Sequence, residues 1–338
     1  MSQEQSTQPA GQSSRSSGNR TPLWVLISVV VGFLLPVCSC MAFASLSIFG
    51  ISLAAGDGAT TSRGFGDAVA IVRVEGLIIS EDEVTTGAPS GVIMDELERA
   101  AADPTVKAII LRVDSPGGTV TGSAQIHEAI LELEKPVVAS MGGTAASGGY
   151  YVSAPADYIF ARPDTVTGSI GVIYTLFNAE DLIDKLGVDV TTITSGPNKD
   201  IGSIWDELTP EQREIFKTLV DESYDQFVEV VAEGRPNLDV EEVRELADGR
   251  IYSGRQAQEN GLVDELGNLD DAIDKAAELG GISGEPRIVE YERIPNLATL
   301  FGGFSGSLTK SESDRLLEIV ETFTTPTLEY RYVGPGLE

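Results

Sequence analysis

The chain has 338 residues, of which 42% are hydrophobic, so it is long enough for one large domain or two modest ones with a sizeable core. Its 52 acidic residues against 23 basic ones give a net charge of −29, and a surface this negative repels nucleic acid, which argues against a DNA or RNA partner. The chain has a single histidine, His127, and this count limits the catalytic sites it can build.

The N-terminal part of the chain is predicted to be a membrane anchor with a tail in front of it. Residues 1–21 are rich in serine, glutamine and glycine, so we expect a disordered tail. Residues 22–55 contain no charged side chain and exceed the roughly 20 residues that a transmembrane helix needs. This apolar run is also longer than the core of a signal peptide, which favours an uncleaved anchor. Arg15 and Arg20 precede it and predict a cytoplasmic N-terminus with the rest of the chain outside. Residues 56–66 read as a linker.

From residue 67 onward, strand-like and helix-like segments alternate. The run 106–113 is continuously apolar, as expected of a strand inside a parallel sheet. The alternation predicts a layered α/β domain with right-handed crossovers over residues 67–281. The predicted strands are 68–78, 106–113, 136–141 and 188–196, and the helices between them are 91–103, 122–135 and 178–187.

Helical segments dominate the next part of the chain. A long helix is predicted over 210–233, because Thr209 is a good N-cap and Gln212 completes a capping box. Shorter helical segments follow from residue 240. The pattern loosens over residues 282–338, a C-terminal extension whose last residues could supply one edge strand.

Two glycine-rich turns carry the candidate chemistry. The stretch RVDSPGGTVTGS (112–123) runs from a buried strand through Gly117 and Gly118 into a helix, which suits an anion nest, although such a stretch is more often a plain strand-to-helix turn. The stretch GGTAASGGYY (142–151) places Ser147 in a second strand-to-helix turn. Because such turns gather at the carboxyl edge of a parallel sheet, we expect Ser147 to face the two glycines.

A serine nucleophile also needs a base, and two side chains are candidates. His127 lies on an amphipathic helix, where a lone histidine is more often a core or surface residue. Lys199 lies in a loop of small residues after a predicted strand, where it is either a solvated lysine or a base made neutral by desolvation. The residues alone leave this choice open.

Six stretches in the same order resemble the signal peptide peptidase A (protease IV) family, in its short, single-repeat form. The resemblance runs from about residue 68 to 280. The stretches are DSPGG, GGTAASGGYY, ARPDTVTGSIGVI, SGPNKDIGS, LTPEQREIF and GRIYSGRQAQENGLVDELG.

This resemblance implies a Clp protease/crotonase-like layered α/β domain behind an N-terminal transmembrane helix. It further implies a membrane-bound serine peptidase in which Ser147 is the nucleophile and Lys199 the general base, with no metal or cofactor. Ser169 matches the residue that orients the lysine amine. The implied oxyanion-hole residues are Gly117, Gly118 and Gly148.

The resemblance also implies substrates and assembly. The expected substrates are signal-peptide remnants or other apolar membrane peptides. The short form is expected to build a ring-like homo-oligomer in which Ser147 of one subunit meets Lys199 of the next. Three alternatives stay open at this point: a peptidase that cuts one specific membrane partner such as a stomatin-like protein, a crotonase-like thioester enzyme, and an inactive scaffold.

Overall fold

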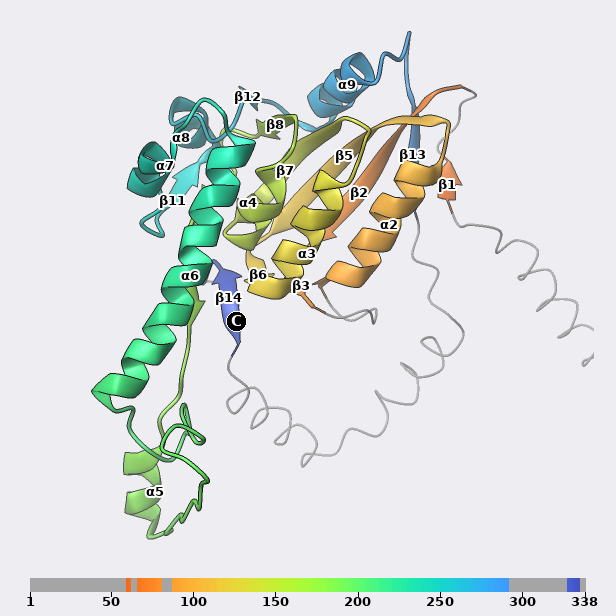
Figure 1. Cartoon of the computed structure of the whole chain (residues 1–338). Helices are drawn as coiled ribbons and strands as arrows, with labels where there is room; N and C mark the ends of the chain where they lie inside the picture. The colour runs from red at the N-terminus through yellow and green to blue at the C-terminus, as the bar shows by residue number, and fades with distance from the viewer. Residues whose placement is uncertain (1–58, 62–65, 81–86, 292–326, 335–338) are drawn as a thin grey trace, which may run out of the picture. The chain divides into compact units, whose positions relative to one another are not determined.

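The structure, a computed structural model, describes residues 59–61, 66–80, 87–291 and 327–334 (Figure 1). The predicted tail 1–21 and anchor 22–55 lie outside these residues. Within the described ranges, no helix is both long enough and apolar enough to cross a membrane.

A nine-stranded sheet forms the centre of the fold, and its four middle strands are parallel. The predicted strand 106–113 lies among them, and its residues Ile109, Ile110 and Leu111 are fully buried because both faces of the sheet are covered. The strand order is β1 (Ala59–Thr61), β13 (Arg287–Tyr291), β2 (Ala68–Glu75), β5 (Val106–Ser115), β7 (Val137–Ala146), β8 (Tyr158–Ala161) and β12 (Glu265–Leu266), with β9 (Val166–Gly168) on β7 and β11 (Ile251–Ser253) on β9.

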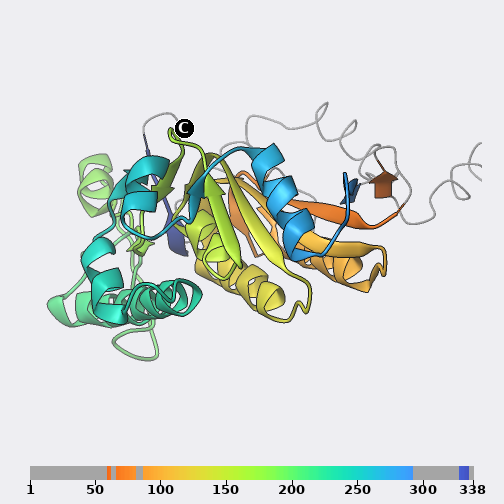
Figure 2. The same ribbon diagram turned by 90° about the horizontal axis from the view of Figure 1, so that it is seen from above.

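Alternate residues of these strands point to two separate hydrophobic cores. On one face, Val72 and Leu111 belong to the larger core, and on the other face Ile71 and Ile110 belong to a smaller core under one helix. Figure 2 shows the helices on opposite sides of the sheet. The first face carries α2 (Ser90–Ala102), α3 (Val120–Leu131), α4 (Gly148–Ser153) and α6 (Pro210–Gly234), and the second carries α9 (Leu269–Leu279).

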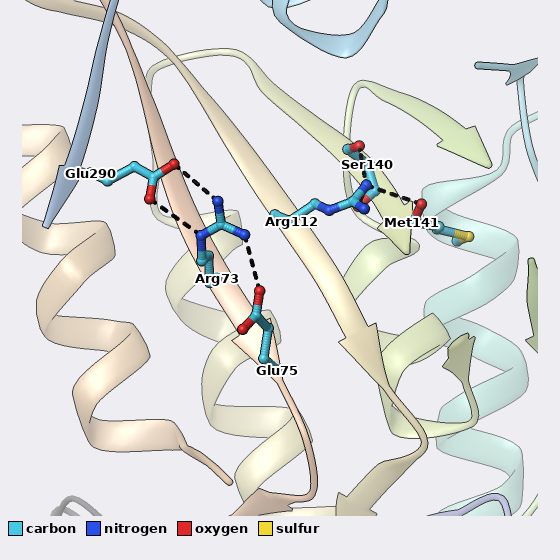
Figure 3. A network of polar contacts seen from close by, with 6 residues as sticks. All are labelled: Arg73, Glu75, Arg112, Ser140, Met141 and Glu290. Carbon is cyan, nitrogen blue, oxygen red and sulfur yellow. Dashed lines mark hydrogen bonds and ion pairs between the residues drawn. The ribbon is translucent and has the colours of Figure 1, made fainter. Parts of the chain in front are cut away.

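Beyond α9, the second face of the sheet becomes polar. Arg73 on β2 forms ion pairs with Glu290 and Glu75 at 3.0 Å each, and Arg112 on β5 donates to the Ser140 hydroxyl at 2.9 Å (Figure 3). Partial burial lowers the pKa of Arg112. This face is therefore apolar only where a helix covers it, and on the rest ion pairs and hydrogen bonds satisfy the charged side chains.

A second, five-stranded sheet lies at the carboxyl ends of these strands. It includes the strand predicted for the C-terminal tail, β14, which pairs with strands on both sides rather than at an edge. The sheet order is β10 (Ile173–Tyr174), β14 (Leu328–Arg331), β6 (Gly117–Thr119), β3 (Ile78–Ile79) and β4 (Ala88–Pro89).

The predicted helices are present with small shifts in their ends. Helix α6 begins at Pro210 with the expected capping box between Thr209 and Gln212, whereas the helix predicted to reach residue 135 ends at Leu131. The remaining helices are α5 (Glu180–Leu186), α7 (Val240–Leu246) and α8 (Gly254–Glu259).

The prediction of a strand over residues 188–196 is wrong. This segment contains no strand, and Ile193 is 94% exposed. It belongs to residues 175–209, which we call the arm, between β10 and α6. The alternation of apolar residues is present there, but no strand among the described residues lies beside it to offer the backbone hydrogen bonds that a strand needs.

A buried ion pair fixes the C-terminal end of α6 to the sheet. The guanidinium of Arg235 donates to Asp264 at 2.5 Å, and the Arg235 side chain is only 5% exposed. The second carboxylate oxygen of Asp264 accepts the backbone N–H of Ile159 on β8 at 2.8 Å.

We expect Asp264→Ala to lower the free energy of unfolding by about 3 kcal/mol, because it leaves a buried guanidinium without its partner. Asp225→Ala is the matched control, since its pair with Arg244 is exposed and contributes at most about 1 kcal/mol. Urea denaturation of both variants measures the difference, and equal losses would contradict the assignment.

Candidate active site

Ser147 lies at the sharp junction between β7 and α4. Its backbone has φ 55° and ψ −117°, and among the described non-glycine residues only Ser147 and Ser169 have a positive φ. Two backbone hydrogen bonds hold the turn, from Ser147 N–H to the Gly168 carbonyl at 2.8 Å and from Tyr151 N–H to the Ser147 carbonyl at 2.9 Å. A strained serine between a strand and a helix is a recurrent way to present a nucleophile.

The turn at Gly117 packs directly against the Ser147 turn, as the sequence predicts. Gly117 has φ +95°, and a Cβ atom built on it would lie 2.5 Å from the backbone nitrogen of Gly148. The hydroxyl of Ser115 accepts the Gly117 N–H at 3.1 Å and donates to the Gly76 carbonyl at 2.6 Å. Backbone therefore touches backbone here, and neither glycine has room for a side chain.

An extended segment of the chain's own C-terminal part crosses these two turns. Strand β14 runs antiparallel to β6, with Tyr330 opposite Gly118, and Tyr332 N–H donates to the Pro116 carbonyl at 2.8 Å. The carbonyl oxygen of Tyr330 lies 3.1 Å from a Cβ built on Gly148, and a Cβ on Gly117 would collide with it. The glycines thus make room for the carbonyl group of an extended peptide.

Ser169, the second strained serine, lies beside the Ser147 turn. It follows β9, whose Gly168 pairs with Ala146 and accepts the Ser147 N–H. Ser169 has φ 51°, is 8% exposed and donates its N–H to the Arg250 carbonyl at 2.8 Å. The fold therefore brings Ser147, Ser169 and the glycine turns together.

Lys199 is not part of this cluster within one chain. It is exposed in the arm, where its N–H donates to the Gly196 carbonyl at 3.2 Å, and no contact among the described residues joins it to Ser147. Figure 1 shows the arm with α5 extending away from α4. Apolar side chains are exposed along the arm, including Leu182 at 59% and Leu186 at 69%.

His127 is a core residue rather than a partner of Ser147. It is 8% exposed and contacts the ring of Tyr151 edge-on, with centroids 5.3 Å apart. Burial lowers its pKa, although Glu233 and Glu128 act in the opposite direction. The neutral ring belongs to the aromatic packing around α4.

Sequence reasoning missed Tyr330, which contributes both a carbonyl group at the glycine turns and a fully buried side chain. Its alternating neighbours in TLEYRY indicate a strand, but nothing local identifies β6 and β10 as the strands it joins. Ser115 was also missed, because its role depends on a carbonyl 39 residues away.

Comparison with known proteins gives overlapping matches. The sequence profile of Clp protease matches residues 66–166, and that of Peptidase family S49 matches residues 129–283. A putative protease of Synechocystis sp. is 44% identical over 248 residues, which cover 71% of this chain and 88% of the relative. A putative signal peptide peptidase SppA of Enterococcus faecium is 39% identical over 253 residues, 71% and 73% of the two chains. Protease 4 of Salmonella typhi is 39% identical over 217 residues, 63% of this chain but 35% of that protein.

The strain at Ser147 leads to a stability prediction. Glycine adopts a positive φ without a steric penalty, so we expect Ser147→Gly to be more stable than Ser147→Ala by about 1 kcal/mol. At Ser123, inside α3, the order reverses because glycine weakens a helix by about 1 kcal/mol relative to alanine. Urea denaturation of the four variants measures both differences. An alanine variant at 147 as stable as the glycine variant would show that the turn is not strained.

Proposed function

Because this chain belongs to peptidase family S49 and is a serine peptidase, we propose that it is a membrane-anchored endopeptidase in which Ser147 and Lys199 form a catalytic dyad. The observation that supports this most is β14, an extended strand whose carbonyl group lies against Gly117 and Gly148 beside the Ser147 turn. A substrate peptide would pair with the strands that β14 pairs with, through backbone hydrogen bonds that recognise any extended sequence.

The proposed chemistry is acyl transfer. The Ser147 hydroxyl attacks the substrate carbonyl while the neutral amine of Lys199 takes its proton. The backbone amides of Gly118 and Gly148 bind the oxyanion, whereas the Gly117 N–H already donates to the Ser115 hydroxyl. Each good donor contributes about 3–4 kcal/mol to the transition state. Lys199 then protonates the leaving amine, water hydrolyses the acyl-enzyme, and Ser147 is regenerated. Ser169 orients the lysine amine in this proposal.

We propose that Lys199 reaches Ser147 from a neighbouring copy of the chain. Three observations support this: the fold clusters every other proposed catalytic group, Lys199 is exposed on the arm, and the arm exposes apolar side chains. The chain also matches only about a third of the length of Protease 4 of Salmonella typhi. A head-to-tail contact between arm and body closes into a ring when its rotation permits.

The proposed substrates are signal-peptide remnants or other apolar peptides. The relative from Enterococcus faecium is named a putative signal peptide peptidase, and the residue of β14 at the glycine turns is Tyr330, whose aromatic side chain is fully buried.

Complementation between two inactive variants tests the dyad and the assembly together. Ser147→Ala and Lys199→Ala are each expected to be inactive. Coexpressed at equal amounts, random mixing of subunits in a ring restores about a quarter of wild-type peptide hydrolysis, because half of the junctions carry an intact serine and half of those an intact lysine.

The control is coexpression of Ser147→Ala with the double variant Ser147→Ala/Lys199→Ala, which stays inactive at every ratio. Native mass spectrometry verifies that subunits mix. Well-mixed assemblies without activity would place both residues of the dyad in one chain and contradict the composite site.

We also propose that residues 22–55 anchor the chain with the peptidase domain outside the cytoplasm. Protease added to intact cells is expected to digest the domain, while the chain stays in the membrane fraction after an alkaline wash. A domain that is protected until the cells are opened would reverse the proposed orientation.

A further inference from the structure

The side chain of Tyr330 occupies an aromatic pocket. It is fully buried although it belongs to a strand of four residues. Its ring stacks on Tyr151, with centroids 4.9 Å apart and an interplanar angle of 24°, and contacts Phe227 at 4.7 Å. Its hydroxyl donates to the backbone carbonyl of Ser223 at 2.8 Å. Burial raises the pKa of Tyr330, so this hydroxyl stays protonated and able to donate.

The pocket is built next to the proposed nucleophile. Tyr151 is on α4, and its backbone N–H bonds the carbonyl of Ser147. Ser223 and Phe227 are one turn apart on α6 and form the adjacent wall, where the Phe227 ring contacts Tyr151 edge-on with centroids 5.0 Å apart. The carbonyl of Tyr330 lies at the glycine turns, so one residue of β14 fills both the proposed carbonyl site and the pocket.

We propose that this pocket receives the side chain of the substrate residue on the N-terminal side of the cleaved bond, and that it selects tyrosine over phenylalanine. This proposal rests on the proposed peptidase function. A flat ring stacks on Tyr151 and packs at a tilt of 53° against Phe227, contacts that aliphatic side chains do not reproduce. The Ser223 carbonyl accepts a hydrogen bond from a hydroxyl, and phenylalanine leaves that position without a donor.

His127 acts on the pocket as a positioning residue. It contacts the edge of the Tyr151 ring, and Tyr151 in turn stacks on Tyr330, so three rings form a row. His127 is itself nearly buried, and removing its ring leaves Tyr151 free to tilt. The single histidine of the chain therefore holds the pocket wall in place without touching the substrate.

The test uses full-length protein and peptides that differ only in the residue before the cleaved bond, with cleavage mapped by mass spectrometry. A net hydrogen bond of about 1 kcal/mol predicts that kcat/KM for tyrosine exceeds that for phenylalanine about fivefold. Leucine is expected to be poorer than both aromatic residues. Ser147-dependent cleavage with phenylalanine equal to or better than tyrosine would overturn the proposal while leaving the peptidase function intact.

Binding to the Ser147→Ala variant separates this proposal from the function on which it rests. The same preference for tyrosine is expected in the Kd values, even though nothing is cleaved. Preferential binding without Ser147-dependent hydrolysis in the wild type would support the pocket and contradict the proposed function. Equal Kd values for the tyrosine and phenylalanine peptides would overturn the pocket.

Two further variants test the parts of the pocket. Because Tyr330 fills the same space, Tyr330→Ala is expected to lower KM for the tyrosine peptide several-fold. An unchanged or higher KM in a folded variant would make β14 a structural strand and overturn the proposal.

His127→Ala is expected to reduce the tyrosine-to-leucine ratio of kcat/KM and His127→Phe to restore it, while Glu128→Ala, exposed on the same helix, leaves the ratio unchanged. A ratio that His127→Ala leaves unchanged would overturn its positioning role.

Discussion

The fold depends on a contact between two backbone turns that have no room for side chains. Gly117 and Gly148 meet at the carboxyl edge of the parallel sheet, where a Cβ atom on Gly117 would strike the Gly148 backbone and one on Gly148 would strike the Ser123 hydroxyl. This approach requires Gly117 to adopt a positive φ and holds Ser147 in a conformation that serine rarely takes. The same constraint creates the space in which the carbonyl of β14 lies, so the strain and the candidate active site share one origin.

The surrounding sheet supports that contact because helices cover its two faces to different extents. Under α2, α3, α4 and α6 the strands present a continuous apolar core, which fixes the start of α4 and with it Ser147. On the opposite face, α9 covers only part of the strands, and the ion pairs of Arg73 with Glu290 and Glu75 take over beyond it. The elements that position Ser147 are thus buried on the helix-covered face of the sheet, and this burial holds the site rigid.

The arm has the opposite character. Its residues are largely exposed, apolar side chains such as Leu182 and Ile193 among them, and it carries Lys199. In the proposed dyad, the nucleophile lies in the rigid body and the base on the arm, so this proposal makes activity depend on assembly. In the proposed ring, the hydrophobic contact that orders the arm is the same event that completes the dyad, which restricts hydrolysis to the assembled form.

The sequence by itself determined the features that depend on local patterns. The buried strand 106–113, the capping box of Thr209 and the glycine turns around Ser147 are each encoded by neighbouring residues, and the structure places them as predicted. Only the tertiary structure decided which strands pair. The alternating segment 188–196 finds no strand partner, whereas four residues of the tail, Leu328–Arg331, fit between β6 and β10. The physical reason is that the periodicity of a segment determines which of its faces is buried, whereas the strand that pairs with its backbone comes from a distant part of the chain. The same holds for Lys199. Its sequence neighbours indicate a loop, but only the fold shows that this loop lies away from Ser147.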